Sequence, residues 1–382
     1  MADLGITRVA NITGLDVIGI PVVTVCRPNA RSLAVSQGKG TDLDAAKASG
    51  LMESIELYHA ERVFQPLVLA TLNELSQRKA VVRSERLPRL SVGSFHPERK
   101  ILWIEGHDWL SDSPKYVPFE MVHANYTLPL PTGSGCFVMS SNGLASGNDL
   151  NEAALHALCE VIERDATTLW VLGSPEAQAR RRIDLDSVDD PTCRLLLGAF
   201  ARAQVAVGAW DITSDLGIPA FACLIVEEER SKLRVLYPTH GMGCHPVREV
   251  ALSRALTEAA QARLTFISGS RDDSGTEKYR RAQGEQEWAR AHERLSGVAT
   301  RRFRDCLSYP AESVNEDLDL VLSRLTGAGF REALIADLSH EKLGIPVVRA
   351  IVPGLEPLYE VPGYLPGARA QHALCWRHEL SS

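Results

Sequence analysis

The stretch from Asn151 to Ala166, NEAALHALCEVIERDA, repeats apolar and polar positions with the period of an α-helix. Leu155, Leu158, Ile162 and the following Leu169 recur at helical spacing. Because residues three and four apart lie on the same side of a helix, these leucines and the isoleucine share one face. The pattern therefore predicts a helix with one face in the protein core.

A second face of this helix carries three carboxylates. At about 100° per residue, Glu152, His156, Glu160 and Glu163 fall within about 80° of one another. The stripe contains no lysine, and Arg164 lies only at its margin, so the Glu/Lys pairs that stabilise exposed helices are missing. The pattern raises the question of what neutralises these acids.

Three segments share a Gly-Ile-Pro sequence that enters a run of β-branched residues. They are Asp16–Pro28, Asp215–Glu227 and Lys342–Gly354. Proline is tolerated at the first position of a strand, so each segment is predicted to be a loop that leads into a buried strand.

A second element also occurs three times, as a glycine-rich turn followed by a helix with two polar residues at i and i+3. The pairs are Glu53 with Glu56, Glu160 with Glu163, and Glu258 with Gln261. Repetition of both elements predicts a mixed α/β fold with three related strand-and-helix layers around a common centre. Residues 1–382 would form a single domain with internal repeats, and 268–294 an exposed polar segment.

Composition narrows the class of protein. With 382 residues, of which 45% are hydrophobic, the chain is long enough to bury a substantial core. Its net charge of −7 argues against nucleic-acid binding. We see no signal peptide and no membrane span, and the 8 cysteines are scattered, so a reducing cytoplasm is the expected location.

Two Glu-x-x-Glu pairs on separate helices can bring four carboxylates to one point, where a cation would offset their repulsion. Oxygen ligands of this kind select Mg²⁺ or Ca²⁺. The turn Ser36–Gly40, SQGKG, could bind an anion through its backbone N–H groups and Lys39. The alternatives are that the acid pairs belong to solvated helices and that Gly-Lys-Gly is an ordinary turn.

Further polar residues flank these pairs. Asn148 and Glu152 could hold a ribose, a phosphate or a second metal, although Asn148 could also be a helix cap. Arg254, Arg263 and Arg271 surround the third pair and could face a phosphate chain; alternatively, Arg271 pairs with the aspartates that follow it. No catalytic nucleophile motif is present, and the catalytic residue stays unassigned. His240 and His245 are candidate general bases or ordinary turn histidines.

These residues resemble the YcaO superfamily of ATP-dependent enzymes that modify peptide backbones. The resemblance rests on SQGKG, ASGLMESIELYHAER, SNGLASGNDLNEAALHALCEVIERDA and RALTEAAQARL with GSRDD. It extends from about Gly5 to Glu356, nearly the whole chain. It implies a YcaO-like fold around a central nucleotide site, with ATP and Mg²⁺ as cofactors.

The resemblance also implies roles for individual residues. Glu53, Glu56, Glu160 and Glu163 would hold Mg²⁺ on the triphosphate, with Asn148 and Glu152 nearby. The residues implied to contact the nucleotide are Lys39, Arg164, Gln261 and Arg271. An acid stripe of this kind would be neutralised by a metal ion from outside the chain.

Members of this superfamily phosphorylate an amide oxygen and then differ in the nucleophile that attacks the activated carbon. A side chain gives an azoline, sulfide gives a thioamide, and an amide nitrogen gives an amidine. The tail GARAQHALCWRHELSS lacks the proline-rich ending of azoline formers, which argues against azoline formation. The opening GITRVANITGLDVIGIPVV and the Leu57-Tyr58-His59 sequence after Glu56, where many relatives place Arg directly after the second Glu, resemble the branch associated with TfuA proteins. That branch implies thioamide formation in a ribosomally made peptide or protein, with a TfuA-like protein delivering sulfur.

Other hypotheses remain open at this point. The chain could be an azoline-forming cyclodehydratase or an amidine-forming macrocyclase. It could also be a non-catalytic nucleotide- or peptide-binding scaffold, or a structural metal-binding protein. Its size and apolar strands are compatible with a homodimer.

Overall fold

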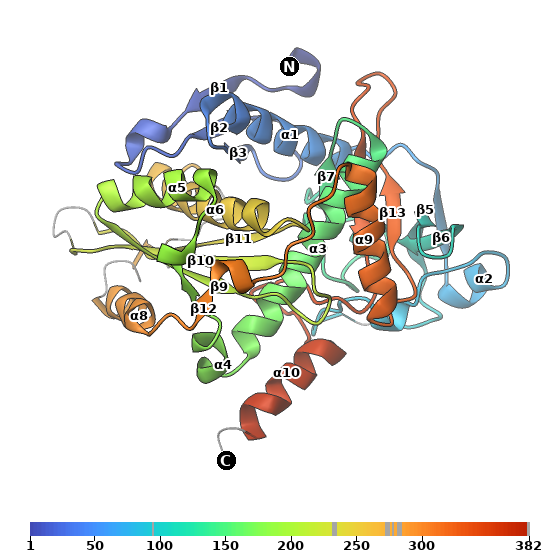
Figure 1. Ribbon diagram of the computed structural model, residues 1–382. Coiled ribbons are helices and arrows are strands. Elements are labelled where there is room, and N and C mark those ends of the chain that lie inside the picture. Colours follow the sequence, from blue (N-terminus) through green and yellow to red (C-terminus); the bar gives the residue numbers. More distant parts are fainter. Residues whose placement is uncertain (94, 231–234, 272–275, 277–278, 281–284, 380–382) are drawn as a thin grey trace. The chain divides into compact units, whose positions relative to one another are not determined.

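The computed structural model describes residues 1–93, 95–230, 235–271, 276, 279–280 and 285–379 (Figure 1). The chain divides into two units, each assembled from separate stretches of sequence. Unit 1 consists of Met1–Ile55, Ser174–Thr213 and Ile218–Pro310, and unit 2 of Glu56–Gly173, Ser214–Gly217 and Ala311–Ser382. Both units contain helices and strands, so the mixed α/β class is confirmed.

Each Gly-Ile-Pro sequence ends immediately before a buried strand. These strands are β2 (Val22–Cys26), β10 (Ala220–Glu227) and β14 (Val347–Ile351). The three glycines have φ angles of +79°, +67° and +62°, in the left-handed region that glycine adopts readily. The prediction that these segments lead into buried strands is confirmed.

Each of these strands is the middle one of three antiparallel neighbours. β2 lies between β1 and β3, β10 between β9 and β11, and β14 between β13 and β7. The flanking strands are β1 (Arg8–Asn11), β3 (Val35–Lys39), β9 (Val205–Asp211), β11 (Thr239–Cys244), β13 (Leu334–Asp337) and β7 (Leu144–Ser146). One strand of each set leads directly into a long helix: β3 into α1 (Leu43–Glu61), β11 into α6 (Arg248–Ser268) and β7 into α3 (Leu150–Leu172).

The segment Ser36–Gly40 is not the predicted turn, because most of it forms strand β3. A Cβ atom added to Gly38 would lie 2.0 Å from the backbone nitrogen of Gly50 on α1. Likewise, a Cβ on Gly241 of β11 would lie 2.2 Å from the carbonyl oxygen of Ala255 on α6. These glycines therefore let a strand contact the helix that follows it.

The acid pairs occupy equivalent places relative to the strands. In each set, the residue after the proline pairs with the last residue of the strand that enters the helix: Val22 with Lys39, Ala220 with Cys244, and Val347 with Ser146. The first acid of each helical pair, Glu53, Glu258 or Glu160, follows fourteen residues after that strand end. Helical geometry then places the second polar residue one turn further on.

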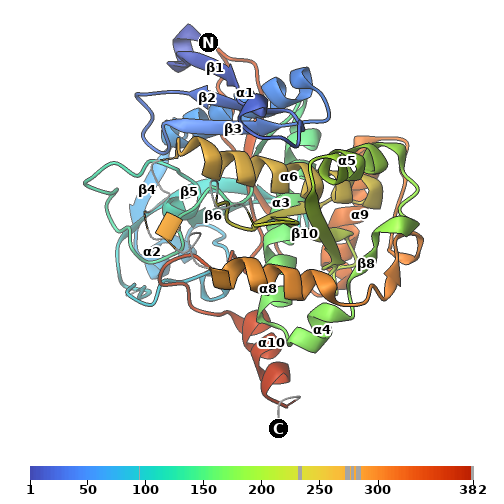
Figure 2. The same cartoon turned by 90° about the vertical axis from the view of Figure 1, so that its left-hand side faces the viewer.

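Unit 1 buries a core beneath its helices. Helix α6 packs on β11 and β10, and α5 (Pro191–Arg202) packs on α6 and β9. Helix α8 (Glu285–Ser296) runs beside β10 in Figure 2. Phe200, Phe221 and Phe303 are buried in this core. The short elements are η1 (Ala2–Leu4), η2 (Thr13–Leu15), α4 (Pro175–Ala179), β8 (Ile183–Asp184), η5 (Leu185–Ser187), β12 (Arg301–Arg302) and η6 (Phe303–Asp305).

Unit 2 is built on a six-stranded sheet with the order β4-β5-β13-β14-β7, in which β6 also pairs with β5. Helix α3 packs on β14 and β7, and α9 (Val314–Gly327) lies against α3, as Figure 1 shows. The C-terminal helix α10 (Ala368–Glu379) also contacts α3. The remaining elements are β4 (Leu67–Ala70), α2 (Leu72–Ser76), η3 (Ser84–Arg86), β5 (Ile101–Asp108), β6 (Ser113–Pro118) and η4 (Phe119–Met121).

The predicted exposed segment Ser268–Arg294 lies partly outside the described residues, because 272–275, 277–278 and 281–284 are not described. Its described C-terminal part belongs to α8, where Ala291 is buried and the other side chains are exposed or half-buried. Among the described helices, none combines the length and apolar character needed to span a membrane.

An ionic cluster joins two strands of unit 2 to the segment before β13. The buried Asp108 accepts hydrogen bonds from the backbone N–H of Ala333 at 2.9 Å and from the hydroxyl of Ser111 at 2.6 Å. Lys115 lies 2.8 Å from Asp108 and 2.9 Å from Glu332. Burial alone raises the pKa of Asp108, but hydrogen bonds from Lys115, Ser111 and the backbone outweigh it and lower the pKa below its usual value.

We expect this cluster to make the protein acid-sensitive. A carboxyl whose pKa is lowered by folding contributes stability above its unfolded pKa of about 4 and loses that contribution as the pH falls through the lower folded value. Asp108→Asn should therefore flatten the acid limb of the stability profile, measured by urea unfolding between about pH 3 and pH 7. The exposed Asp319→Asn on α9 is the matched control. Parallel acid limbs for wild type and Asp108→Asn would contradict this account.

Candidate functional site

The predicted helix with the acid stripe is α3, and its apolar face is buried as expected. Arg164 lies against two of the acids. Its guanidinium nitrogens are 3.7 Å from Glu160 and 3.2 Å from Glu163. The Glu163 side chain is only 4% exposed, and that of Glu160 is 19% exposed. One cation within the chain therefore offsets part of the negative charge of this stripe.

The start of α3 is organised by Asp149, which caps the helix by accepting from the backbone N–H of Glu152 at 2.9 Å. The alternative that Asn148 is the cap is therefore wrong. Instead, the side chain and backbone N–H groups of Asn148 donate to Glu152 at 2.8 and 3.0 Å. These contacts hold the Glu152 carboxylate beside the amide of Asn148.

Glu56, on the part of α1 that belongs to unit 2, contacts the end of strand β7. Its carboxylate accepts from the backbone N–H of Ser146 at 2.9 Å and from the Ser146 hydroxyl at 2.5 Å. The end of β7 thus fixes the orientation of Glu56.

In unit 1, the first acids of α1 and α6 are held in a similar way. Glu53 accepts from the backbone N–H of Gln37 at 2.8 Å, and Glu258 from that of Met242 at 3.2 Å. Gln37 and Met242 each lie two residues before the end of their strand. Lys39 also forms a 2.5 Å ion pair with Glu258, with both side chains mostly buried. Strands β3, β11 and β7 therefore each present a backbone donor, at or near the strand end, to a carboxylate on a helix.

The other arginines and histidines of unit 1 differ in their surroundings. Arg263 does not stand free to face phosphate, since it is buried and lies 2.8 Å from Asp16 and 3.1 Å from Glu227. Arg271 is half-buried, and the aspartates proposed as its alternative partners lie outside the described residues. Burial lowers the pKa of His245 to about 4, and its ring accepts from the N–H of Val247, which favours the turn role.

Gln261 follows Glu258 by one turn of α6 and is half-buried. The structure thus brings together Glu160, Glu163 and Arg164 in one group of contacts and Asn148 with Glu152 in another.

Two residues that orient these side chains were missed from sequence. Asp149 could have been found from its place three residues before Glu152, since Asp followed by Glu at that spacing marks a helix start. Ser146 carries no such signal, because only strand pairing places it.

The predicted metal ligands share one type of donor. All four predicted ligands are carboxylates, and Mg²⁺ prefers hard oxygen donors. Hydrogen bonds already orient Glu53 and Glu56, and an arginine orients Glu160 and Glu163. Within the described ranges, no three His, Cys, Asp or Glu side chains form a ready-made metal cluster. The donors present fit Mg²⁺ in kind.

Residues 37–356 match a family described as YcaO cyclodehydratase, ATP- and Mg²⁺-binding. A Rhizobium leguminosarum bv. trifolii protein, described as an uncharacterized protein in the tfuA 3′ region, is 38% identical over 363 residues, covering 93% of this chain and 85% of that protein. An uncharacterized protein of Methanothermobacter thermautotrophicus is 34% identical over 374 residues, covering 93% of this chain and 91% of the other.

Solved structures share the fold. A heterocyclase in complex with substrate and cofactor superposes with a TM-score of 0.74 at 25% identity, covering 96% of this chain and 51% of that one. YcaO from Methanopyrus kandleri, bound with AMPPCP and Mg²⁺, superposes with a TM-score of 0.72 at 22% identity, covering 96% and 91% of the two chains.

Fold and sequence together define an ATP-dependent enzyme of the class that modifies peptide backbones. The chain belongs to the YcaO family. ATP and Mg²⁺ are the cofactors of this family.

Proposed function

We propose that this protein forms thioamides in a ribosomally made peptide or protein. The observation that carries the choice of sulfur is the 38% identical relative in the tfuA 3′ region. The geometry supports ATP-dependent activation, because hydrogen-bond donors or an arginine orient each of the four carboxylates that would face a metal nucleotide.

The proposed reaction has two steps, phosphorylation of the amide oxygen and attack by hydrosulfide. The γ-phosphoryl group of ATP is transferred to the amide oxygen of the peptide, and ADP leaves. Hydrosulfide then attacks the activated carbon, so that a C–S bond forms and the C–O bond breaks. Phosphate leaves with the former amide oxygen and the proton of hydrosulfide ends on phosphate, which gives a thioamide, ADP and phosphate without any change of oxidation state.

We assign roles to the residues on the basis of their contacts and the family resemblance. Glu53, Glu56, Glu160 and Glu163 would hold Mg²⁺, which neutralises charge on the triphosphate. The residues assigned to the nucleotide are Lys39, Asn148, Glu152, Arg164, Gln261 and Arg271. Because Arg164 already contacts Glu160 and Glu163, we expect it to keep both acids oriented when the nucleotide arrives.

A second candidate is azoline formation, which the structural likeness to a heterocyclase favours. Amidine formation and a non-catalytic scaffold are the remaining alternatives.

The partners of the proposed reaction are the precursor peptide and a TfuA-like protein that delivers sulfur. All eight cysteines are free thiols, which suits a reducing cytoplasm.

We expect calorimetric titration to show ATP binding that requires Mg²⁺ and disappears with excess chelator. Lys39→Met should weaken this binding about tenfold, because a charge-assisted contact to phosphate is lost. The exposed Lys47→Met on α1 is the control, since Lys47 pairs with Asp44 at the surface. Equal affinity in Lys39→Met and wild type would remove Lys39 from the nucleotide site.

Mass spectrometry of the peptide product then separates the candidate reactions. Exchange of oxygen for sulfur would support thioamide formation, whereas loss of water would support an azoline or amidine. Mg²⁺-dependent ATP binding without any peptide modification, in the presence of sulfide and the TfuA-like partner, would favour the scaffold.

A further inference from the structure

Unit 2 contains a small cavity beside Arg349, in the middle of the buried strand β14. The cavity has a volume of about 40 Å³. The polar residues that line it are Arg349, Ser140, Asn142 and Glu356. Most of its wall is apolar, including Met121 and Val138. Arg349 as a whole is 2% exposed, so almost the whole cationic side chain is shielded from water.

Arg349 is only partly satisfied by protein atoms. Its Nε donates to the carbonyl oxygen of Met121 at 3.0 Å, and one terminal nitrogen donates to the carbonyl oxygen of Ser140. The other terminal nitrogen, Nη1, is buried and has no hydrogen-bond partner. In the described part of the chain, no carboxylate lies within ion-pair distance of Arg349, although the negative charge of Glu160 attracts it at longer range. A buried cation with an unsatisfied donor is costly, so a bound group is expected to contact it.

The size and lining of the cavity restrict the identity of that group. A volume of about 40 Å³ admits one or two water-sized particles and excludes a phosphate or a peptide carboxylate. The side-chain oxygen of Asn142 is likewise buried without a partner. A hydrosulfide ion has lone pairs that accept from the guanidinium and one S–H that can donate to this amide oxygen. Its negative charge also neutralises Arg349, which a water molecule would not do.

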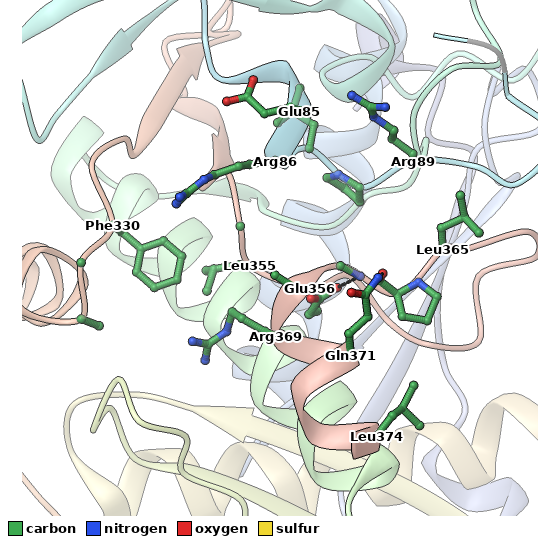
Figure 3. A pocket seen from close by; sticks show the side chains of 18 residues that line it. Glu85, Arg86, Arg89, Phe330, Leu355, Glu356, Leu365, Arg369, Gln371 and Leu374 are labelled. Atoms are coloured by element: carbon green, nitrogen blue, oxygen red, sulfur yellow. Dashed lines mark hydrogen bonds between the residues drawn. The ribbon is translucent and has the colours of Figure 1, made fainter. Parts of the chain in front are cut away.

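The position of the cavity connects it with the proposed chemistry. Val161, the residue after Glu160 on α3, forms part of its wall. A larger pocket of about 720 Å³, shown in Figure 3, shares Pro88, Leu355 and Glu356 with the small one. Exposed Arg86 and Gln371 line this larger pocket, so solvent reaches it. A small ion could pass from this pocket toward Arg349.

We propose that the cavity beside Arg349 binds one small anion and that in the reaction this anion is hydrosulfide. The identity of the anion rests on the proposed thioamide function, whereas the anion site rests only on the unsatisfied guanidinium and the cavity. The site would hold the nucleophile apart from bulk water until the amide is activated.

The anion site is tested first without any variant. Crystals of the wild-type protein soaked in bromide should show an anomalous peak within hydrogen-bond distance of Arg349 Nη1. A cavity that contains only water at high bromide concentration would overturn the proposal. This readout does not depend on activity, so it separates failure of the anion site from failure of the proposed function.

The role of hydrosulfide is tested by kinetics. Bromide should raise the KM for sulfide and leave the KM for ATP unchanged. Val138→Leu, which fills the cavity and leaves Arg349 in place, should raise the KM for sulfide about tenfold or more and abolish the bromide peak, while Mg-ATP binding persists. Val188→Leu, at a buried site of unit 1, controls for overpacking. A bromide peak in a protein whose sulfide dependence is unaffected by bromide and by Val138→Leu would overturn hydrosulfide as the anion.

Discussion

Glu160→Gln and Glu163→Gln should each lower ATP turnover about 100-fold or more while the protein still folds. Glutamine keeps the shape of the side chain but lacks the negative charge that binds Mg²⁺. Both residues sit one turn apart on α3 and contact Arg164, so each change also removes one of the two ion pairs that hold Arg164 in place. The rate of phosphate release with precursor peptide, measured over a range of Mg²⁺ concentrations, should show that residual activity requires more Mg²⁺.

The control for these variants is Glu293→Gln, the same chemical change at an exposed position of α8. It should leave turnover unchanged and alter the free energy of unfolding by less than about 0.5 kcal/mol. Thermal unfolding of all three variants establishes that they are folded. Wild-type turnover in either Glu160→Gln or Glu163→Gln would remove that residue from the metal site.

Arg369→Met should lower the free energy of unfolding by about 3 to 5 kcal/mol. Arg369, on α10, makes two hydrogen bonds to Asp165 of α3 at 2.9 and 2.8 Å and also pairs with Asp215. The Asp165 side chain is fully buried, so loss of the arginine leaves a carboxylate without its cation. The backbone N–H of Glu356, which donates to Asp165 at 3.0 Å, cannot replace the charge. Urea unfolding of the full chain measures the effect.

A double variant separates the buried charge from lost packing. Adding Asp165→Asn to Arg369→Met removes the uncompensated carboxylate, so it should recover part of the lost stability. Arg290→Met on α8 is the matched control, because the Arg290 side chain is 65% exposed and pairs with Glu287 on the same helix. A cost for Arg369→Met as small as that of Arg290→Met would show that the Asp165 pair does not anchor α10.

Several parts of the fold could be predicted from local patterns. The helical repeat of Leu155, Leu158 and Ile162 identified α3, because a buried helix face imposes its period on the sequence. The three Gly-Ile-Pro sequences identified strands β2, β10 and β14, because the glycine conformation and the proline that follows act locally. The motifs around the acid pairs led to the family, which the sequence and structural comparisons establish.

The local patterns were insufficient where distant residues meet. The glycines of SQGKG suggested an anion-binding turn, yet Gly38 lies in strand β3, where its lack of a Cβ atom lets the backbone of α1 pack directly against it. Arg263 suggested a phosphate contact, yet Asp16 and Glu227 surround it in the fold. The metal and nucleotide roles of the acid-pair residues stay predictions that the proposed variants will test.

The sequence by itself determined the elements and the family, since helical period, turn conformation and motif spacing are properties of neighbouring residues. Only the tertiary structure decided the partners of each charge. Arg164 lies between two acids, Arg369 reaches a buried aspartate, and Arg349 is enclosed beside a cavity with one donor unsatisfied. These outcomes depend on packing between segments far apart in the chain, where burial removes water and makes each unpaired charge costly.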